Sequence, residues 1–362
     1  CDFAKYSLFV VFFPQLIAGP IVLQKHTIPQ FTLSVFTKPL FMNLAVGGSL
    51  FAIGLFKKIV LADSMAPTAN SVFNLALAGN SVPFEAAWLG IFAYTFQIYF
   101  DFSGYCDMAL GLARMFSITL PINFNSPYHA TSIVDFWRRW HITLSGFLRD
   151  YLYIPLGGSR SGKVRQYASL TITMLLGGLW HGASWTFVFW GLLHGVYLTI
   201  NHGWSALTKN VALPGYIPAF LPKLLSQFLT FLVVMVAWVF FRAESFDAAL
   251  SILEGMSGQT DFYTYKMWGE VLSQGGTLWW QIVALLVVVF YLPNSIVLTQ
   301  KYSPVLKFPK AMKNDSLTTY LREKLIWNPN KAWSTAALVM ITSSLYYLYS
   351  SNNITEFIYF NF

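Results

Sequence analysis

Charged side chains are scarce in this chain. Asp, Glu, Lys and Arg make up 10% of its 362 residues, against roughly 25% in an ordinary soluble domain. Hydrophobic residues make up 56% and the mean hydropathy is +0.53. A soluble domain of this length could not bury so much apolar surface, so the composition excludes that class and indicates a membrane protein. The aromatic content of 18% suits lipid-facing and interfacial positions.

Cysteine is also rare. Cys1 and Cys106 are the two cysteines, which excludes a disulfide framework and gives no metal-ligand spacing. The chain begins at Cys1 without an initiator Met and enters an apolar segment almost at once, so we expect missing N-terminal residues that include further spans. Internal repeats and low-complexity tracts are absent from the sequence. We therefore expect one membrane domain over residues 1–362.

Apolar windows with few or no charges mark the expected membrane spans. They cover Tyr6–Gln24, Pro39–Phe56, Ala86–Phe100 with an extension to Ala113, Gln166–Thr208, Leu224–Phe241, Val271–Gln300 and Ala332–Thr355. Most are close to the ~20 residues that cross a bilayer as a helix. Pro14 predicts a kink or a re-entrant turn in the first window. The windows together predict an all-α, polytopic membrane protein.

The window Gln166–Thr208 contains no Asp, Glu, Lys or Arg and is about twice as long as one span needs. It therefore predicts two helices, with Gly177–Gly178 and Gly182 as the natural break.

Lys and Arg concentrate in two segments, and such clusters mark cytoplasmic loops. The first holds Arg138, Arg139, Arg149, Arg160, Lys163 and Arg165, and the second holds Lys301, Lys307, Lys310, Lys313, Arg322, Lys324 and Lys331. Four spans between the clusters place both on the cytoplasmic side. Lys57 and Lys58 then fall on the outer side, which is a mild conflict with the rule.

Pro127 and Pro155 bracket a stretch in which apolar and charged residues alternate at helical spacing. Its pattern predicts an amphipathic helix at the cytoplasmic interface, with Asp135 near Arg138 or Arg139 and with Trp side chains as anchors. The interfacial face consists of Trp137, Trp140, Leu144 and Phe147. His141 could project from this helix toward the membrane interior.

Two histidines and two carboxylates lie in apolar sequence, where ionisable groups are candidates for a functional site. His181 follows Trp180 between glycines and could remove a proton from a hydroxyl, because a neutral imidazole is a base near pH 7. The alternative is a buried histidine bonded to a backbone carbonyl. His194 is interpreted as structural or as a partner of the site.

Asp101 has two open interpretations. It could face an internal polar cavity and orient a histidine or bind substrate, or it could pair with Arg114 or with Arg138 and Arg139. For Asp107 we favour a structural role.

Five ordered stretches carry a family resemblance. They are Phe13-Pro-Gln-Leu-Ile-Ala-Gly-Pro20-Ile, Phe100-Asp-Phe-Ser-Gly-Tyr105, Phe136-Trp-Arg-Arg-Trp-His141-Ile-Thr-Leu-Ser145, Leu148-Arg-Asp-Tyr-Leu-Tyr-Ile-Pro-Leu-Gly-Gly158 and Gly177-Gly-Leu-Trp-His181-Gly. On these motifs the chain resembles the membrane-bound O-acyltransferases, in particular the bacterial branch that O-acetylates alginate and other exopolysaccharides. The resemblance covers about the first half of the chain, to Gly195.

The resemblance implies a helical bundle with re-entrant or interfacial helices around a central tunnel, in the bacterial inner membrane. It implies His181 as the catalytic histidine, with His141 near it. The acetyl group would come from a cytoplasmic thioester, acetyl-CoA, and pass to periplasmic acetyltransferase partners that modify a polysaccharide. No bound cofactor, metal or nucleic-acid partner is implied. Thr143, Gly146 and Gln24 depart from the alginate-type motif, which weakens alginate itself as the acceptor.

Acyl transfer to a hydroxyl needs a base and hydrogen-bond donors for the oxyanion. We take His181 as the base, and candidate donors are His141, Tyr151, Tyr153 or backbone N–H groups freed at the glycine break. Irregular backbone at membrane depth is tolerated around a cavity, so the break itself predicts a tunnel, with Trp180 in its lining. Arg149 and the first basic cluster suit a phosphate-bearing donor.

Other functions remain open at this point. Within the same reaction class, the alternative is transfer of acetyl or D-alanyl to teichoic acid or peptidoglycan. A secondary transporter would also show broken helices and intramembrane His and Asp, but it usually shows internal repeats.

Overall fold

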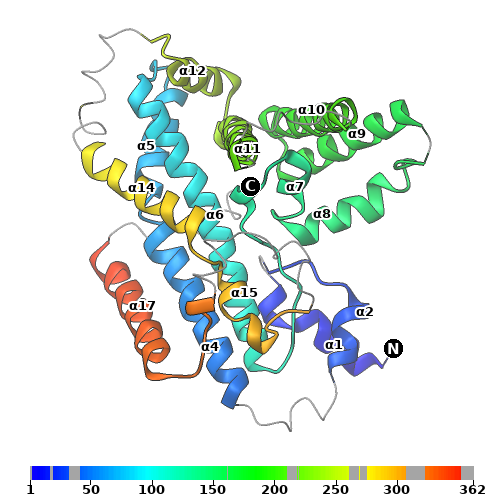
Figure 1. Cartoon of the computed structure of the whole chain (residues 1–362), viewed down its shortest axis with the longest axis vertical. Helices are drawn as coiled ribbons and strands as arrows, with labels where there is room; N and C mark the ends of the chain where they lie inside the picture. The colour runs from blue at the N-terminus through cyan, green and yellow to red at the C-terminus, as the bar shows by residue number, and fades with distance from the viewer. Residues whose placement is uncertain are drawn as a thin grey trace.

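The computed structural model describes residues 2–16, 19–31, 41–160, 162–209, 218, 220–260, 269, 275–306 and 323–351. Every regular element in these ranges is helical, as the apolar windows predict (Figure 1). In chain order they are α1 (Phe3–Val11), η1 (Phe13–Gln15), α2 (Gln24–Thr27), η2 (Ile28–Gln30), α4 (Phe41–Phe56), η3 (Lys57–Ala62), α5 (Ala66–Leu77), α6 (Phe84–Met115), η4 (Pro127–His129), α7 (Ile133–Trp137), α8 (Ile142–Leu148), η5 (Arg149–Tyr153), α9 (Lys163–His181), α10 (Trp185–Thr208), α11 (Phe220–Arg242), α12 (Phe246–Ser257), α14 (Gly275–Tyr291), α15 (Ser295–Leu298), η7 (Gln300–Tyr302) and α17 (Lys331–Ser350).

Helix α6 forms the centre of the bundle. Its 32 residues span about 48 Å at ~1.5 Å per residue, and α4, α5, α11, α12 and α14 pack around it. Glycines bring α4 and α6 together: a Cβ at Gly54 would lie 2.5 Å from the carbonyl oxygen of Gly104, and one at Gly47 would lie 2.5 Å from that of Gly111. Small residues allow such close packing of helices in membranes.

Two described helices are long and apolar enough to cross a membrane. They are the continuous helix Phe41–Ala62, formed by α4 and η3, and α11. The apolar part of α14, Gly276–Tyr291, is shorter. In the first window, α1 ends at Val11 and Pro14 lies in a 3-10 turn, so the expected interruption is present.

Lys57 and Lys58, which the span count puts on the outer side, follow directly on α4 within one continuous helix. The chain continues as a π-helix through Ala62, and the side chains of both lysines are only 12% exposed. The Lys57 ammonium lies 2.6 Å from Asp107, and that of Lys58 lies 2.7 Å from both Asp63 and Asp101. In the second basic cluster, Lys307, Lys310, Lys313 and Arg322 lie outside the described residues.

The long window Gln166–Thr208 forms two antiparallel helices, α9 and α10, as its length predicts (Figure 1). Helix α9 continues through Gly177 and Gly178 and ends at His181, so Gly182 alone begins the break. Ser184 then caps α10 by accepting a hydrogen bond from the backbone N–H of Thr186. The break places His181 at a helix end.

The stretch between Pro127 and Pro155 is not the single amphipathic helix that its spacing predicts. It forms α7, α8 and the π-helix η5, and the first break falls at His141, whose backbone is left-handed with φ 42°. The pair that the pattern predicts is present between Asp135 and Arg139, at 2.9 Å. The cause of the break is a set of hydrogen bonds from a distant segment, described below.

Candidate active site

Two histidines that lie 40 residues apart in sequence line one narrow cavity. His141 comes from the linker between α7 and α8, and His181 from the end of α9. Their exposed fractions are 4% and 7%. The lining consists of Ile98, Trp137, Trp140, His141, Leu144, His181, Trp190, Trp238 and Phe241. Apart from the histidines, the cavity wall is apolar and largely aromatic.

His181 is surrounded by aromatic rings. Its ring centroid lies 5.4 Å from that of Trp190, in a perpendicular arrangement, and 5.1 Å from that of Phe241. The chain leaves His181 through Gly182, where a Cβ would lie 2.7 Å from the ring of Phe187. Glycine at 182 therefore lets α10 return close to the histidine.

His141 is held from the segment that precedes α7. The backbone N–H of Ile142 donates to the carbonyl oxygen of Asn123 at 3.0 Å, and that of Asn125 donates to Arg139 at 2.9 Å. The His141 Nδ1 lies 3.2 Å from Asn123 Oδ1. A left-handed backbone at a residue other than glycine is strained and persists where the surroundings impose it. Here the paired segment imposes it.

His141 lies in the linker between α7 and α8, outside the spanning helices, and its imidazole is buried. Burial lowers the pKa of His141 well below its ordinary value, and the neighbouring His181 lowers the pKa further. At neutral pH the His141 ring is therefore uncharged and can accept a proton or a hydrogen bond.

The cavity is closed in this structure. The space open to a water-sized sphere is about 10 Å³, whereas a single water needs ~10–15 Å³.

His194 lies directly behind this cavity. It is fully buried, and its Nδ1 accepts a hydrogen bond from the indole N–H of Trp137 at 3.3 Å. Trp137 and Trp190 lie in the cavity wall and contact His194 at ring-centroid distances of 5.1 and 4.8 Å. The structure thus places His194 as a support for the wall.

Asp101 lies in an ion pair away from the cavity lining. Its carboxylate is 1% exposed and meets Lys58 on the adjoining helix. The sequence suggested other cations, but Arg114 donates to the carbonyl oxygen of Tyr302 at 3.1 Å and Arg139 pairs with Asp135. Asp101 is therefore ion-paired, as its second interpretation expects, but its partner is Lys58 and not an arginine.

The other sequence-based candidates also lie outside the lining. Tyr151 and Tyr153 belong to η5, where Tyr151 is 57% exposed, and Arg149 pairs with Asp150 at 2.8 Å. Trp180 is 56% exposed, although its ring lies 5.1 Å from that of His181.

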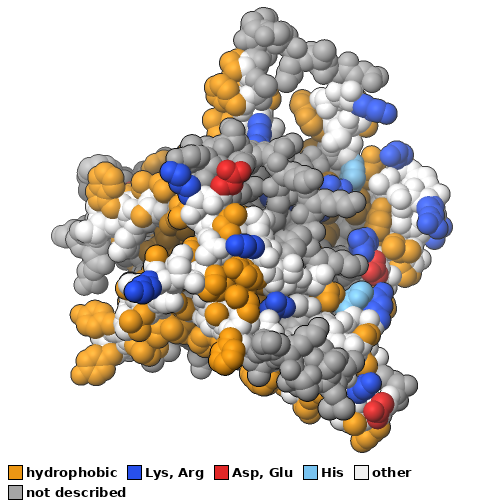
Figure 2. Space-filling model, turned by 60° about the horizontal axis from the view of Figure 1, so that its bottom comes forward, with side chains coloured by type: hydrophobic (Ala, Val, Ile, Leu, Met, Phe, Trp, Pro, Cys, Tyr) orange, Lys and Arg blue, Asp and Glu red, His pale blue; other side chains and the backbone are white. Residues whose placement is uncertain are grey.

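The first basic cluster is largely at the surface. Its exposed members are Arg138, Arg149, Arg160, Lys163 and Arg165. On the face shown in Figure 2, Lys and Arg are more frequent than Asp and Glu among the hydrophobic side chains.

Sequence reasoning missed Trp190 and Asn123. Trp190 is 2% exposed and lines the cavity, and its indole N–H has no hydrogen-bond partner among the described residues. Asn123 is 1% exposed and contacts His141. The one available signal for Asn123 was its place in the Pro121–Pro127 stretch, which has turn chemistry rather than a helical pattern.

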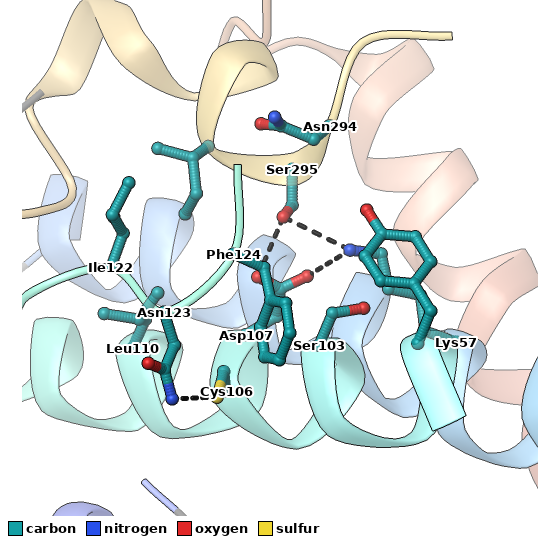
Figure 3. A pocket seen from close by; sticks show the side chains of 12 residues that line it. Lys57, Ser103, Cys106, Asp107, Leu110, Ile122, Asn123, Phe124, Asn294 and Ser295 are labelled. Atoms are coloured by element: carbon teal, nitrogen blue, oxygen red, sulfur yellow. Dashed lines mark hydrogen bonds and ion pairs between the residues drawn. The ribbon is translucent and has the colours of Figure 1, made fainter. Parts of the chain in front are cut away.

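Asn123 lines a second small cavity (Figure 3). Its polar wall includes the ion pair of Lys57 with Asp107, to which Ser295 also donates at 2.8 Å. Within the described ranges, no group of three or more His, Cys, Asp or Glu could hold a metal ion.

Comparison with known proteins gives a consistent family. The model described as MBOAT, membrane-bound O-acyltransferase family, matches residues 1–220. The chain is 50% identical to the "Peptidoglycan O-acetyltransferase" of Helicobacter pylori over 256 residues, which are 71% of this chain and 47% of the relative.

Two further relatives carry the name "Probable alginate O-acetylase AlgI". The protein of Azotobacter vinelandii is 39% identical over 377 aligned positions, covering 100% of this chain and 70% of the relative. That of Pseudomonas aeruginosa is 42% identical over 316 positions, covering 85% and 56%. The chain thus spans between 47% and 70% of the length of these three relatives.

Proposed function

Because this chain belongs to the membrane-bound O-acyltransferase family, we propose that it transfers an acetyl group toward the O-acetylation of a polysaccharide outside the cytoplasm. The donor is a cytoplasmic thioester, acetyl-CoA, and the acceptor is an exopolysaccharide such as alginate. We place the protein in the bacterial inner membrane as a multi-pass protein that works with periplasmic acetyltransferase partners. The names of the relatives from Azotobacter and Pseudomonas support this acceptor class.

One observation carries the proposal: two buried histidines, His141 and His181, line the same aromatic cavity. Acyl transfer to a hydroxyl needs a base within hydrogen-bond reach of the attacking oxygen, a contribution of typically 10²–10⁴-fold. An apolar wall strengthens each polar interaction inside it, because the local dielectric constant is low. A neutral imidazole in this apolar cavity supports the assignment of such a base.

The proposed step is balanced as follows. The acceptor oxygen attacks the thioester carbonyl carbon while His181 Nε2 or Nδ1 takes the hydroxyl proton. The tetrahedral intermediate then collapses, the carbon–sulfur bond breaks, and the proton passes from His181 to the leaving thiolate. The products are the acetyl ester and CoA as its free thiol.

Trp190 is our candidate for stabilising the oxyanion. Trp190 lines the cavity, and its buried indole N–H has no hydrogen-bond partner in the part of the chain that the structure describes. An unpaired buried donor costs free energy until it finds an acceptor, so it favours a developing negative charge. Tyr151 and Tyr153 lie outside the lining and are not proposed for this role.

The exposed basic side chains between α7 and α9 suit the phosphates of CoA. We place this side of the bundle in the cytoplasm, an orientation that the positive-inside rule supports. The donor would then approach from the basic side, and the tunnel expected from the helix break would open by movement of the cavity wall.

A second acceptor is favoured by a specific observation. The relative from Helicobacter pylori, named for peptidoglycan, is 50% identical to this chain. Peptidoglycan is therefore our second candidate acceptor, besides an exopolysaccharide. The reaction and the histidines that carry it would be the same.

The proposal is tested by the ester content of polymers in cells that lack their own copy of the gene. Wild-type protein should restore acetyl esters, and His181→Ala should not. His202→Ala is the matched control, because His202 is partly exposed and lies outside the cavity lining. Quantifying esters separately in secreted polysaccharide and in purified peptidoglycan identifies the acceptor.

Normal ester content with a stably inserted His181→Ala protein would rule out the base assignment. Unchanged esters in both polymers with the wild-type chain would rule out the proposed reaction.

A further inference from the structure

Asn123 Oδ1 takes part in three hydrogen bonds. It accepts from the backbone N–H of Thr143 at 3.2 Å and from the Thr143 hydroxyl at 2.9 Å, and it lies 3.2 Å from His141 Nδ1. Asn123 is 1% exposed, so water does not replace these contacts.

These contacts fix the tautomer of the histidine. The two ends of an asparagine amide are distinguished by their partners, and a backbone N–H can only donate. The Thr143 N–H therefore requires the oxygen of Asn123, not its NH₂ group, to face the linker. Since Oδ1 can only accept, Nδ1 of His141 must carry the hydrogen.

The second cavity holds the other end of the amide. Asn123 Nδ2 donates to Cys106 Sγ at 3.5 Å, and the carboxylate of Asp107 lies in the same wall (Figure 3). The amide is thus held from both ends, with its oxygen toward His141 and its NH₂ group toward α6.

We infer that Asn123 is a positioning residue that holds neutral His141 as the Nδ1–H tautomer. The lone pair of the imidazole is then on Nε2, at the ring edge away from Asn123. His141 therefore meets a substrate as a hydrogen-bond acceptor, and not as the neutral oxyanion donor that the sequence suggested. The inference rests on the proposed function, because it assigns a task to one of the two histidines in the acyl-transfer cavity.

The role of Asn123 in acyl transfer is tested with two substitutions in the full chain, reconstituted in vesicles with the periplasmic acetyltransferase partners, acetyl-CoA and polymer fragments. Asn123→Leu keeps the approximate size and removes the acceptor. It should lower kcat by about 10²-fold, the cost of misplacing a reacting group by about 1 Å. Asn123→Asp keeps the acceptor and should retain most of the activity.

The pH profile separates positioning from packing. A carboxylate at position 123 favours protonated His141, so the acid limb of kcat/KM for Asn123→Asp should move to higher pH by about one unit or more. Ser103→Ala is the control, because Ser103 lines the cavity next to Asn123 and its hydroxyl makes no hydrogen bond within the described residues. Its profile should match the wild type.

The tautomer itself is measured by ¹⁵N NMR of histidine-labelled protein, without substrate. Wild type and Asn123→Asp should show His141 with hydrogen on Nδ1, and Asn123→Leu should show a mixture or the Nε2–H form. Hydrogen on Nε2 of His141 in the wild type would overturn the inference, whatever the activity.

The two failures are distinguishable. If the wild type transfers no acetyl group, the proposed function fails while the NMR result still decides the tautomer. If Asn123→Leu keeps full kcat and an unshifted profile in a chain that transfers acetyl, Asn123 has no positioning role.

Discussion

The contact between α9 and α10 gives a prediction with an internal control, because two adjacent glycines differ in what surrounds them. A Cβ at Gly178 would lie 2.2 Å from the backbone carbonyl oxygen of Phe187 and 3.3 Å from the Cα of Gly191. A Cβ at Gly177 would meet one atom, the end of the Leu148 side chain, at 3.2 Å. Gly178→Ala must therefore separate two backbones, whereas Gly177→Ala displaces a flexible methyl group.

The magnitude follows from these distances. Restoring ordinary contact at Gly178 requires α9 and α10 to move apart by about 1 Å. Overpacking of this kind lowers the free energy of unfolding by about 1–3 kcal/mol. The higher helix propensity of alanine raises it by about 1 kcal/mol. Gly177→Ala gains the same stabilisation from helix propensity and introduces little steric clash. Gly178→Ala should therefore be the less stable of the two variants by about 1–3 kcal/mol.

Activity should separate the two variants further. His181 lies three residues beyond Gly178 on the same helix, and a misplacement of about 1 Å costs up to ~10²-fold in rate. Thermal unfolding in detergent and acetyl transfer in vesicles measure the two effects. Equal melting temperatures and equal rates for Gly177→Ala and Gly178→Ala would refute the close contact of α9 with α10.

Three further variants test separate parts of the structure. Trp190→Phe removes one N–H from the cavity wall and should lower kcat by ~10²–10³-fold with little change in KM; steady-state kinetics with acetyl-CoA would contradict the oxyanion role if kcat is unchanged. His141→Ala should lower the ester content of the polymer by ~10²–10⁴-fold, and full activity would leave this residue with an anchoring role only. Lys57→Met leaves the carboxylate of Asp107 buried and unpaired, so it should cost ~3–5 kcal/mol of stability. The double variant Lys57→Met with Asp107→Leu should recover most of that stability, as measured by thermal unfolding. An equal loss of stability in the single and the double variant would show that the unpaired carboxylate does not cause the loss.

Much of the fold could be predicted from the sequence because the bilayer limits the length of a helix. The window Gln166–Thr208 is too long for one span, and Gly182 is the residue at which the structure ends the first helix. Length predicts the two helices, but the glycines alone do not select the break, because the helix continues through Gly177 and Gly178 and ends only before Gly182.

The break at His141 could not be predicted in the same way. The spacing of Trp and Arg residues around it fits one continuous amphipathic helix, and a helical pattern cannot show a left-handed residue within it. The left-handed backbone is imposed by Asn123, which lies 18 residues earlier in the chain. Contacts at that separation depend on the tertiary arrangement, which periodicity does not encode.

The buried lysines were missed for a related reason. A hydropathy window ends where charges begin, so the window Pro39–Phe56 stops before Lys57 and Lys58, and the span count puts both lysines on the outer side. Their partners Asp107 and Asp101 lie on α6, more than 40 residues away, and neutralise them inside the bundle. A charge pair across two helices is visible only when the helices are placed side by side.

The central claim is that acetyl transfer takes place at the cavity between His141 and His181. The most direct measurement is the rate of CoA release from acetyl-CoA by the wild-type chain and by His181→Ala, each reconstituted in vesicles with its periplasmic acetyltransferase partners and polymer fragments. We expect acceptor-dependent release by the wild type and a rate lower by ~10²–10⁴-fold for the variant. Equal rates from the two proteins, with both correctly folded, would contradict the claim.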